Sequence, residues 1–160
     1  MDSQTQISEQ PLAKTVYTAG AIVSGGRVGL GASDDGALNV ELRRPPEMGG
    51  EGGGTNPEQL FAVGYASCFA SALGVVARRQ RIELGDVSVR SSVSLLTTED
   101  RGYNVAVELH VSLPQIEDPE RATQLVADTH RICAYSNATR GNIDLTLTAN
   151  GQHVGAHAAT

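Results

Sequence analysis

Two cysteines are the most reactive side chains of this 160-residue sequence. Cys68 lies in the middle of the segment 60–77, which carries no charged residue. A thiol in apolar surroundings stays protonated and reacts slowly, and in the middle of a helix it gains little from the helix dipole. A nearby cation would activate it, and arginine fits best because it stays charged and can hold two oxygens at once. Cys68 is thus an inert core residue or a nucleophile that needs an arginine.

Cys133 stands at the end of a second predicted helix, which begins at Asp118-Pro119. The C-terminal end of a helix is negative and disfavours a thiolate, so Cys133 is a poor attacking group. It could still form a disulfide with an oxidised partner sulfur. The two cysteines therefore differ in the direction that an attacking and a resolving cysteine require.

The helix that positions Cys68 has a clear start. Asn56 is predicted as the N-cap, Pro57 occupies the first helical position, and Gln59 stands where a capping-box partner belongs. The helix should run to about Gln80 and be buried on most of its faces. Cys68 shares one helical stripe with Phe61, Tyr65, Ala72 and Val75. The many Ala, Gly and Ser residues favour close packing against a copy of the same helix, which predicts a homodimer.

The remaining segments are typical of an α+β fold. Short strands are predicted at 15–24, 27–32 and 37–42, followed by the loop 43–57, which is rich in Gly and Pro and should hold no regular structure. A long hairpin is expected from 86–97 and 103–113, then the second helix, the loop 134–141 and a last strand, Asn142–Thr148. We expect a flexible tail at 1–14, one domain at 15–149 and a loose tail at 150–160.

Composition excludes several classes of protein. The net charge is −6 and the pI about 5.1, and no basic cluster extends beyond Arg43-Arg44 and Arg78-Arg79, which argues against nucleic-acid binding. The apolar segment 60–77 is of borderline length for a membrane span and is diluted by Gly, Tyr and Ser, so a core helix is expected. The first residues lack the pattern of a signal peptide, and two cysteines then indicate a reducing, cytoplasmic location.

Three motifs in consistent order carry a family resemblance. GGRVG, TNPEQLFAVGYASCF and CAYSNATRGN resemble the organic hydroperoxide resistance (Ohr) proteins of the OsmC-like superfamily, over roughly Val16 to Ala149. Members are thiol-dependent peroxidases that reduce organic hydroperoxides to alcohols. The resemblance implies the OsmC-like fold, with antiparallel sheets packed around long central helices in an intertwined homodimer.

The resemblance also implies a role for each matched residue. Cys68 matches the cysteine that attacks the peroxide, and Cys133 matches the resolving cysteine. Arg27 matches the arginine that stabilises the thiolate, and Glu58 matches the carboxylate that holds this arginine. The implied reductant is a lipoyl group on a carrier protein, with no bound cofactor or metal. The sequence departs from the family at Ala134, where a proline is common, which affects the rigidity of the loop but removes no reactive group.

Other interpretations of the same residues stay open. A cysteine hydrolase would need a histidine base, and no histidine lies in the matched motifs. A non-enzymatic redox sensor would use the same two cysteines. His130 with Cys133, or His153 with His157, has a spacing found in metal sites, but four clustered ligands are not evident.

Overall fold

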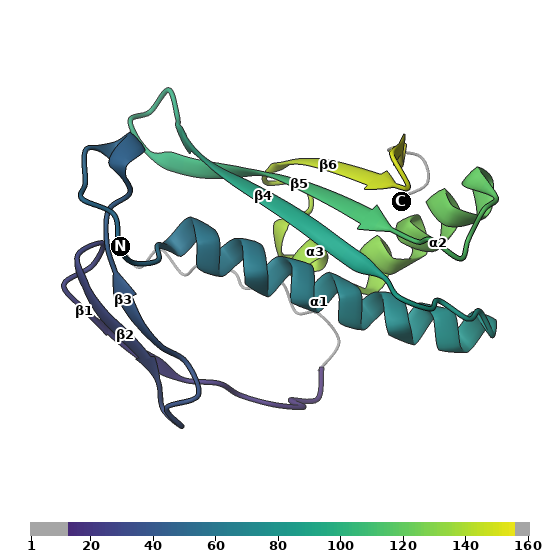
Figure 1. The fold of residues 1–160 in the computed structure, drawn as a ribbon, viewed down its shortest axis with the longest axis horizontal. Helices are drawn as coiled ribbons and strands as arrows, with labels where there is room; N and C mark the ends of the chain where they lie inside the picture. The colour runs from purple at the N-terminus through teal and green to yellow at the C-terminus, as the bar shows by residue number, and fades with distance from the viewer. Residues whose placement is uncertain (1–12, 156–160) are drawn as a thin grey trace, which may run out of the picture. The chain divides into compact units, whose positions relative to one another are not determined.

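The structure is a computed structural model that describes residues 13–155 (Figure 1). The chain divides between Thr55 and Asn56 into two compact units. The prediction of an α+β chain is confirmed, since each unit has its own sheet and the second unit adds the long helices.

The N-terminal unit is a small antiparallel sheet in the order β1-β2-β3. Its strands are β1 (Ala21–Ser24), β2 (Gly29–Ser33) and β3 (Asn39–Leu42). The first strand is shorter than predicted, because Ala21 pairs with Ser33 at the end of β2, so residues before Ala21 have no strand opposite them in this sheet. Gly25 and Gly26 form the turn after β1 with positive φ angles of 82° and 63°, a backbone region that glycine adopts without strain.

The loop after β3 holds more structure than its composition indicated. A short 3₁₀ helix, η1 (Pro46–Met48), lies where no regular structure was predicted. Pro46 fixes a backbone angle that suits the first helical turn, and Gly49 closes this turn in the left-handed conformation while its N–H donates to the Pro46 carbonyl. Proline and glycine thus build a brief helix here as well as limiting it.

The second unit begins with helix α1 (Pro57–Gln80), which starts and ends as predicted. The Asn56 side chain accepts a hydrogen bond of 2.9 Å from the Gln59 N–H, as expected of an N-cap. Arg81 ends the helix in the left-handed conformation and donates its N–H to the Ala77 carbonyl. The helix is unbroken through Gly64 and Gly74.

A four-stranded sheet in the order β4-β5-β6-β7 packs beside α1 (Figure 1). Its strands are β4 (Ser88–Thr97), β5 (Tyr103–Ser112), β6 (Asp144–Ala149) and β7 (Gln152–His153). The predicted hairpin is confirmed, with Ser88 opposite Ser112 and Thr97 opposite Tyr103. β6 runs parallel to β5, which requires the helical connection between them.

Two helices make this connection, where only one was predicted. α2 (Pro119–Ile132) is capped by Asp118 as expected, but the predicted loop 134–141 contains a second helix, α3 (Ala134–Thr139). β7 likewise lies in the segment 150–160, which was predicted to be a loose tail, and pairs with β6. Residues 156–160 lie outside the described residues.

The core of the second unit forms between α1, α2 and the inner face of the sheet. Its fully buried side chains come from all of these elements: Tyr65, Phe69, Leu73, Val107, Leu109, Val111, Leu125 and Val126. Removing such side chains from water is the main stabilising contribution to the fold. Cys133 belongs to this core, and Cys68 packs against its edge.

Helix α1 is less covered than predicted. Only 33% of its most apolar window is buried in the chain, and Val63 is 70% exposed in the middle of the helix. By length and composition alone α1 could cross a membrane, a test that core helices also pass. The sheet, α2 and α3 pack against one side of α1, which leaves a stripe containing Val63, Ser67 and Ser71 exposed.

Candidate active site

The two cysteines meet in the second unit. Cys68 lies on α1, Cys133 lies between α2 and α3, and their Sγ atoms are 3.6 Å apart, with the Cys133 thiol directed at the Cys68 sulfur. Both are free thiols. A disulfide bond is about 2 Å long, so a modest movement of the two side chains would join them. The structure thus brings together two residues that are separated by 65 positions in the chain.

Cys133 is fully buried in the core of the second unit. It is 1% exposed, and its own N–H donates to the Thr129 carbonyl at the end of α2. Burial raises the pKa of the Cys133 thiol; the Ser136 N–H and hydroxyl lower it in part, and the neighbouring Cys68 sulfur raises it. The position of Cys133 at the end of a helix predicts a poor attacking group. The raised pKa agrees with that, but its main cause is burial.

Cys68 is half-buried beside a cluster of three aromatic rings. Phe61, Tyr65 and Tyr135 have centroid separations of 5.8 to 5.9 Å, and Phe61 and Tyr65 meet edge to face. These spacings are in the range that favours aromatic pairs. Two of the rings lie on α1 within two turns of Cys68, so the predicted stripe does present an apolar surface next to the thiol.

A hydroxyl network ties α1 to α3 behind this cluster. Tyr65 is fully buried, and its hydroxyl lies 3.0 Å from the Ser136 Oγ and 3.3 Å from the Thr139 Oγ1. Ser136 is also fully buried. Buried hydroxyls that lack such partners would destabilise the fold. The network therefore fixes α3, and with it Cys133, against the helix that carries Cys68.

Gly64 allows α3 to pack closely against α1. A Cβ atom at position 64 would lie 3.3 Å from the Tyr135 ring. That distance is tighter than most contacts of this kind, so the ring would have to shift to accept a side chain. Glycine can also allow a helix to break, but α1 is continuous through Gly64, and this residue instead makes room for α3.

Glu58 lies in the first turn of α1, ten residues before Cys68. On an unbroken helix this corresponds to about 15 Å along the axis, farther than a glutamate side chain extends. A break of α1 near Gly64 would bring Glu58 closer to Cys68, but the helix is continuous and excludes such a break. A site shared between two subunits stays a prediction. Glu58 is half-buried and makes interactions of its own.

Arg27 belongs to the N-terminal unit, in the turn between β1 and β2. It is half-buried and also makes interactions of its own. Its neighbours Gly25 and Gly26 both adopt positive φ angles, so the turn that carries the guanidinium depends on glycine. The assignment of Arg27 to the thiol of Cys68 stays a prediction.

Sequence reasoning missed Tyr135, Ser136 and Thr139, because it treated residues 134–141 as a loop. Their spacing did hold a signal. Positions 135 and 139 are one helical turn apart, and residues at i and i+4 share a face of a helix. In the structure, the Thr139 hydroxyl donates to the Tyr135 carbonyl at 2.8 Å.

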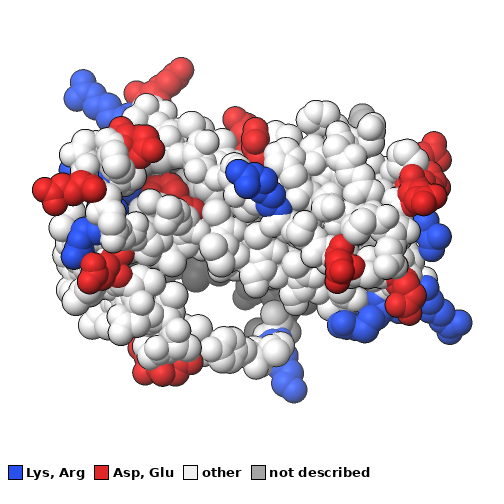
Figure 2. All heavy atoms as spheres, in the orientation of Figure 1, with Lys and Arg blue, Asp and Glu red and all other residues white. Residues whose placement is uncertain are grey.

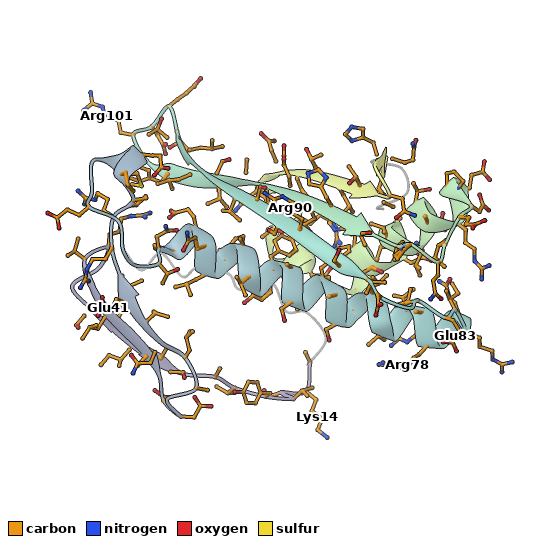
Figure 3. All side chains as sticks on the ribbon, in the orientation of Figure 1. Lys14, Glu41, Arg78, Glu83, Arg90 and Arg101 are labelled. Carbon is orange, nitrogen blue, oxygen red and sulfur yellow. The ribbon has the colours of Figure 1, made fainter. Side chains whose placement is uncertain are left out.

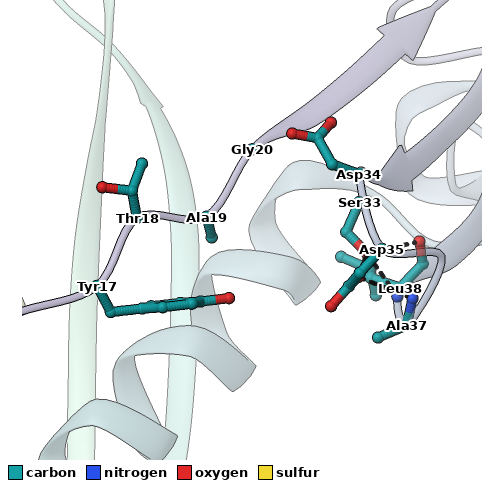
Figure 4. A pocket seen from close by; sticks show the side chains of 9 residues that line it. All are labelled: Tyr17, Thr18, Ala19, Gly20, Ser33, Asp34, Asp35, Ala37 and Leu38. Atoms are coloured by element: carbon teal, nitrogen blue, oxygen red, sulfur yellow. Dashed lines mark hydrogen bonds between the residues drawn. The ribbon is translucent and has the colours of Figure 1, made fainter.

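Two other features of the structure contribute no reactive centre. Within residues 13–155, no group of three or more His, Cys, Asp or Glu side chains could hold a metal ion, and His157 lies outside the described residues. A cavity of about 410 Å³ opens in the N-terminal unit between residues 17–20 and 33–38 (Figure 4). Two of its polar side chains bond to each other, since the Ser33 hydroxyl donates to the Asp35 carboxylate at 2.6 Å. It contains none of the four predicted site residues.

The middle of α1, on both sides of Cys68, carries no charged side chain. Arg78 and Glu83 stand at the C-terminal end of α1 and just after it (Figure 3), and the helix between Glu58 and Arg78 carries no charge. On the face shown in Figure 2, acidic and basic side chains are interspersed, and the described residues form no gathered basic surface there. The part of the candidate site that α1 forms is therefore apolar.

Comparison with known proteins agrees with this geometry. The OsmC-like protein family matches residues 50–148. The chain is 50% identical to an organic hydroperoxide resistance protein of Xanthomonas axonopodis pv. citri, over 84% of this chain and 95% of that protein. It is 44% identical to the organic hydroperoxide resistance protein OhrB of Bacillus subtilis, over 82% of this chain and 96% of that protein.

A solved structure gives the same result for the fold. The crystal structure of an organic hydroperoxide resistance protein from Legionella pneumophila superposes with a TM-score of 0.80 at 49% identity, covering 84% of this chain and 97% of that chain. Sequence and fold thus agree over most of the length of both proteins. The chain belongs to the organic hydroperoxide resistance proteins of the OsmC-like family.

Proposed function

We propose that this protein is a thiol-dependent peroxidase that reduces organic hydroperoxides to alcohols through a Cys68–Cys133 disulfide. The single observation that carries the proposal is the 3.6 Å separation of the two sulfurs in a chain of this family. Two free thiols at this distance, one half-buried and one sealed, suit an attacking and a resolving cysteine.

In the first step, the Cys68 thiolate attacks one peroxide oxygen of ROOH. The O–O bond breaks, an S–O bond forms, and the departing alkoxide takes up a proton and leaves as the alcohol ROH. Cys68 is oxidised to a sulfenic acid. The peroxide is the oxidant, so this step needs no other co-reactant.

In the second step, the Cys133 sulfur attacks the Cys68 sulfenic acid. The S–O bond of Cys68 breaks, the S–S bond forms, and the hydroxide leaves as water with the proton of the Cys133 thiol. No electron leaves or enters the protein in this condensation. An external dithiol then reduces the disulfide by exchange and restores both thiols.

Arg27 and Glu58 complete the proposed site. The Arg27 guanidinium stabilises negative charge on the Cys68 sulfur and on the departing oxygen, where charge develops during the attack. Glu58 holds the guanidinium in place through an ion pair. The uncharged middle of α1 and the aromatic cluster favour an alkyl peroxide over hydrogen peroxide, because they offer apolar contacts to the organic group.

We propose a homodimer as the working form. Val63 on the exposed stripe of α1 is 70% exposed, and Ile22 and Leu30 of the N-terminal sheet are 74% and 55% exposed. These are large apolar side chains that a partner subunit could cover. A dimer also gives Glu58 a route to a site that α1 alone does not offer. The protein would need a reducing compartment, such as the cytoplasm, to keep its thiols free.

A coupled assay tests the proposal directly. It compares a tertiary alkyl hydroperoxide, a fatty-acid hydroperoxide and hydrogen peroxide, each with dihydrolipoamide or with thioredoxin as the reductant. We expect repeated turnover with the organic peroxides and dihydrolipoamide, which stands in for a lipoyl group on a carrier protein. Oxidation that stops after one equivalent with every reductant would instead indicate a redox sensor, and the absence of any alcohol would refute the peroxidase.

A further inference from the structure

Two contacts join the same pair of segments in the second unit. The sulfurs of Cys68 and Cys133 lie 3.6 Å apart, and the Tyr65 hydroxyl lies 3.0 Å from the Ser136 Oγ. Tyr65 stands three residues before Cys68 on α1, and Ser136 stands three residues after Cys133. Residues three apart on a helix are neighbours on one face, about 4.5 Å along its axis. The hydroxyl contact therefore lies close to the sulfur contact and joins the same two segments.

One arrangement of protons uses every donor of the hydroxyl network. Thr139 gives its only hydroxyl proton to the Tyr135 carbonyl at 2.8 Å, so towards Tyr65, at 3.3 Å, it can only accept. Tyr65 then donates to Thr139 and accepts from Ser136. Tyr65 and Ser136 are both fully buried, so water does not replace a partner that is lost. The Tyr65 hydroxyl is the centre of this network, because it bonds to two side chains of α3.

Hydrogen bonds on both sides of Cys133 join α2 to α3. The Cys133 N–H donates to the Thr129 carbonyl in the last turn of α2. The Arg140 side chain, just after α3, donates to the His130 carbonyl of α2 at 2.6 Å. These bonds make residues 129–140, which we call the α2–α3 corner, a single body that carries the Cys133 sulfur. A bond that fixes this corner to α1 therefore also fixes the distance between the two sulfurs.

We propose that Tyr65 is a positioning residue for disulfide formation: its hydroxyl holds the α2–α3 corner so that the Cys133 sulfur stays in contact with Cys68. This inference rests on the proposed function. A thiol held next to its target reacts as if its concentration were very high, and a corner that can move away loses part of this advantage. Tyr65 does not touch the reacting bonds. The Cys133 sulfur still displaces hydroxide from the Cys68 sulfenic acid, and the hydroxide leaves as water with the thiol proton.

A single turnover separates the two chemical steps. Reduced protein is mixed with one equivalent of an alkyl hydroperoxide and quenched with acid at successive times, and the alcohol and the disulfide are measured separately. Tyr65→Phe keeps the ring and removes only the hydroxyl. The ratio of the disulfide rate to the alcohol rate should fall about fivefold, the effect of one lost buried hydrogen bond. An equal slowing of both steps would contradict the proposal, and a faster disulfide step would mean that the hydroxyl holds the sulfurs apart.

Two further substitutions distinguish positioning from a general loss of stability. Tyr103→Phe is the matched control, because it makes the same change at a tyrosine of β5 that is 73% exposed, and both rates should stay unchanged. Ser136→Ala removes the other end of the hydrogen bond and should slow the disulfide step by a similar factor. Tyr65→Phe combined with Ser136→Ala should be no slower than the slower single variant, because both break the same bond. Multiplied effects would mean that the two hydroxyls act independently, which contradicts the proposal.

A second measurement needs no peroxide. Reduced and oxidised lipoamide, mixed in known ratios, set the fraction of the protein that carries the Cys68–Cys133 disulfide. In Tyr65→Phe the equilibrium constant for forming this disulfide should fall by about the same factor as the rate, because the effective concentration of one thiol at the other enters both.

The outcomes separate this inference from the proposed function. An unchanged equilibrium constant together with an unchanged ratio of rates would overturn the role of Tyr65 and leave the peroxidase intact. If the wild-type protein forms the disulfide with lipoamide but releases no alcohol from peroxide, the peroxidase is refuted, and the equilibrium constant of Tyr65→Phe still decides the positioning role. A wild-type protein that forms no disulfide in either experiment refutes both.

Discussion

The surroundings of Cys68 and of Cys133 differ although the two sulfurs are neighbours. Cys68 is half-buried in the middle of α1, a helix whose covered side faces the core and whose other side is exposed. Cys133 is 1% exposed at the junction of α2 and α3, among buried core residues. The first position can be reached by a substrate, and the second can be reached only by the first sulfur. This difference supports the proposal that Cys68 attacks the peroxide and Cys133 resolves the sulfenic acid.

Replacing each cysteine with serine should have the largest effect on activity and tests the different roles of the two sulfurs. Cys68→Ser should abolish turnover, because a serine hydroxyl is not a nucleophile for peroxide without a base. Cys133→Ser should release one equivalent of alcohol and then stall, or over-oxidise at Cys68, since the sulfenic acid has no partner. Alcohol release per protein, measured with a single addition of alkyl hydroperoxide, distinguishes the two variants. Multiple turnovers in Cys68→Ser would contradict the assignment.

Variants of Arg27 test the proposed attack by Cys68 alone. Arg27→Ala should slow the attack by about 10²-fold, the usual effect of removing a group that stabilises charge in the transition state. Arg27→Lys should recover only part of the rate, since lysine keeps the charge but lacks the planar fork. Stopped-flow rates of alcohol formation provide the measurement. The later disulfide step should be unaffected. A selective slowing of that step would mean that Arg27 acts on Cys133 and not on Cys68.

The titration of His130 tests whether the region around Cys133 is buried as the structure shows. Burial, and then the neighbouring Arg140 guanidinium, lower the pKa of His130. The unfolded chain takes up this proton near its ordinary pKa of about 6.5, while the folded protein does so only at lower pH. The contribution of His130 therefore destabilises the fold as pH falls below about 6.5, by at most about 1.4 kcal/mol per pH unit.

Chemical denaturation of wild type and His130→Leu across this pH range measures the effect. The difference in the free energy of unfolding between the two should change with pH below about 6.5, because leucine does not titrate. A constant difference would mean that His130 takes up its proton equally well in both states. It would also mean that the region is more open than its burial indicates.

Removing the N-caps of α1 and α2 should have the smallest effect of these substitutions. Asn56→Ala and Asp118→Ala each remove a side-chain acceptor from a first helical turn and should cost about 1 kcal/mol in the free energy of unfolding. Asn56 is buried and Asp118 is exposed, so water can replace the lost acceptor more easily at Asp118. We expect the larger loss at Asn56. A larger loss for Asp118 in urea titrations would contradict this order.

Local signals in the sequence were enough to predict much of the second unit. Asn56-Pro57 and Asp118-Pro119 marked two helix starts to the residue, because caps and first-turn prolines act within a few positions. The alternating strands around Asp100-Arg101-Gly102 gave the hairpin. α3 was missed since six residues with Ser, Asn and Thr have low helix propensity, and its helix depends on contacts of Tyr135 and Ser136 with α1.

The candidate site was predictable only where motifs carried it. The pairing of Cys68 with Cys133 followed from the resemblance, and the 3.6 Å distance supports it. The partial exposure of α1 could not be read from hydrophobic periodicity, because small apolar residues are found on every face of the helix. The contact between Tyr65 and Ser136 could not be predicted from the sequence, because it joins residues 71 positions apart.

The most direct test of the account is the fate of the two thiols after one equivalent of an alkyl hydroperoxide. Intact mass and peptide mapping of acid-quenched protein should show the loss of two hydrogens, a Cys68–Cys133 cross-link within one chain, and one equivalent of alcohol. Dihydrolipoamide should restore the reduced mass. Two intact free thiols after the peroxide is consumed, or a cross-link between two chains in its place, would contradict the central claim that Cys133 resolves Cys68.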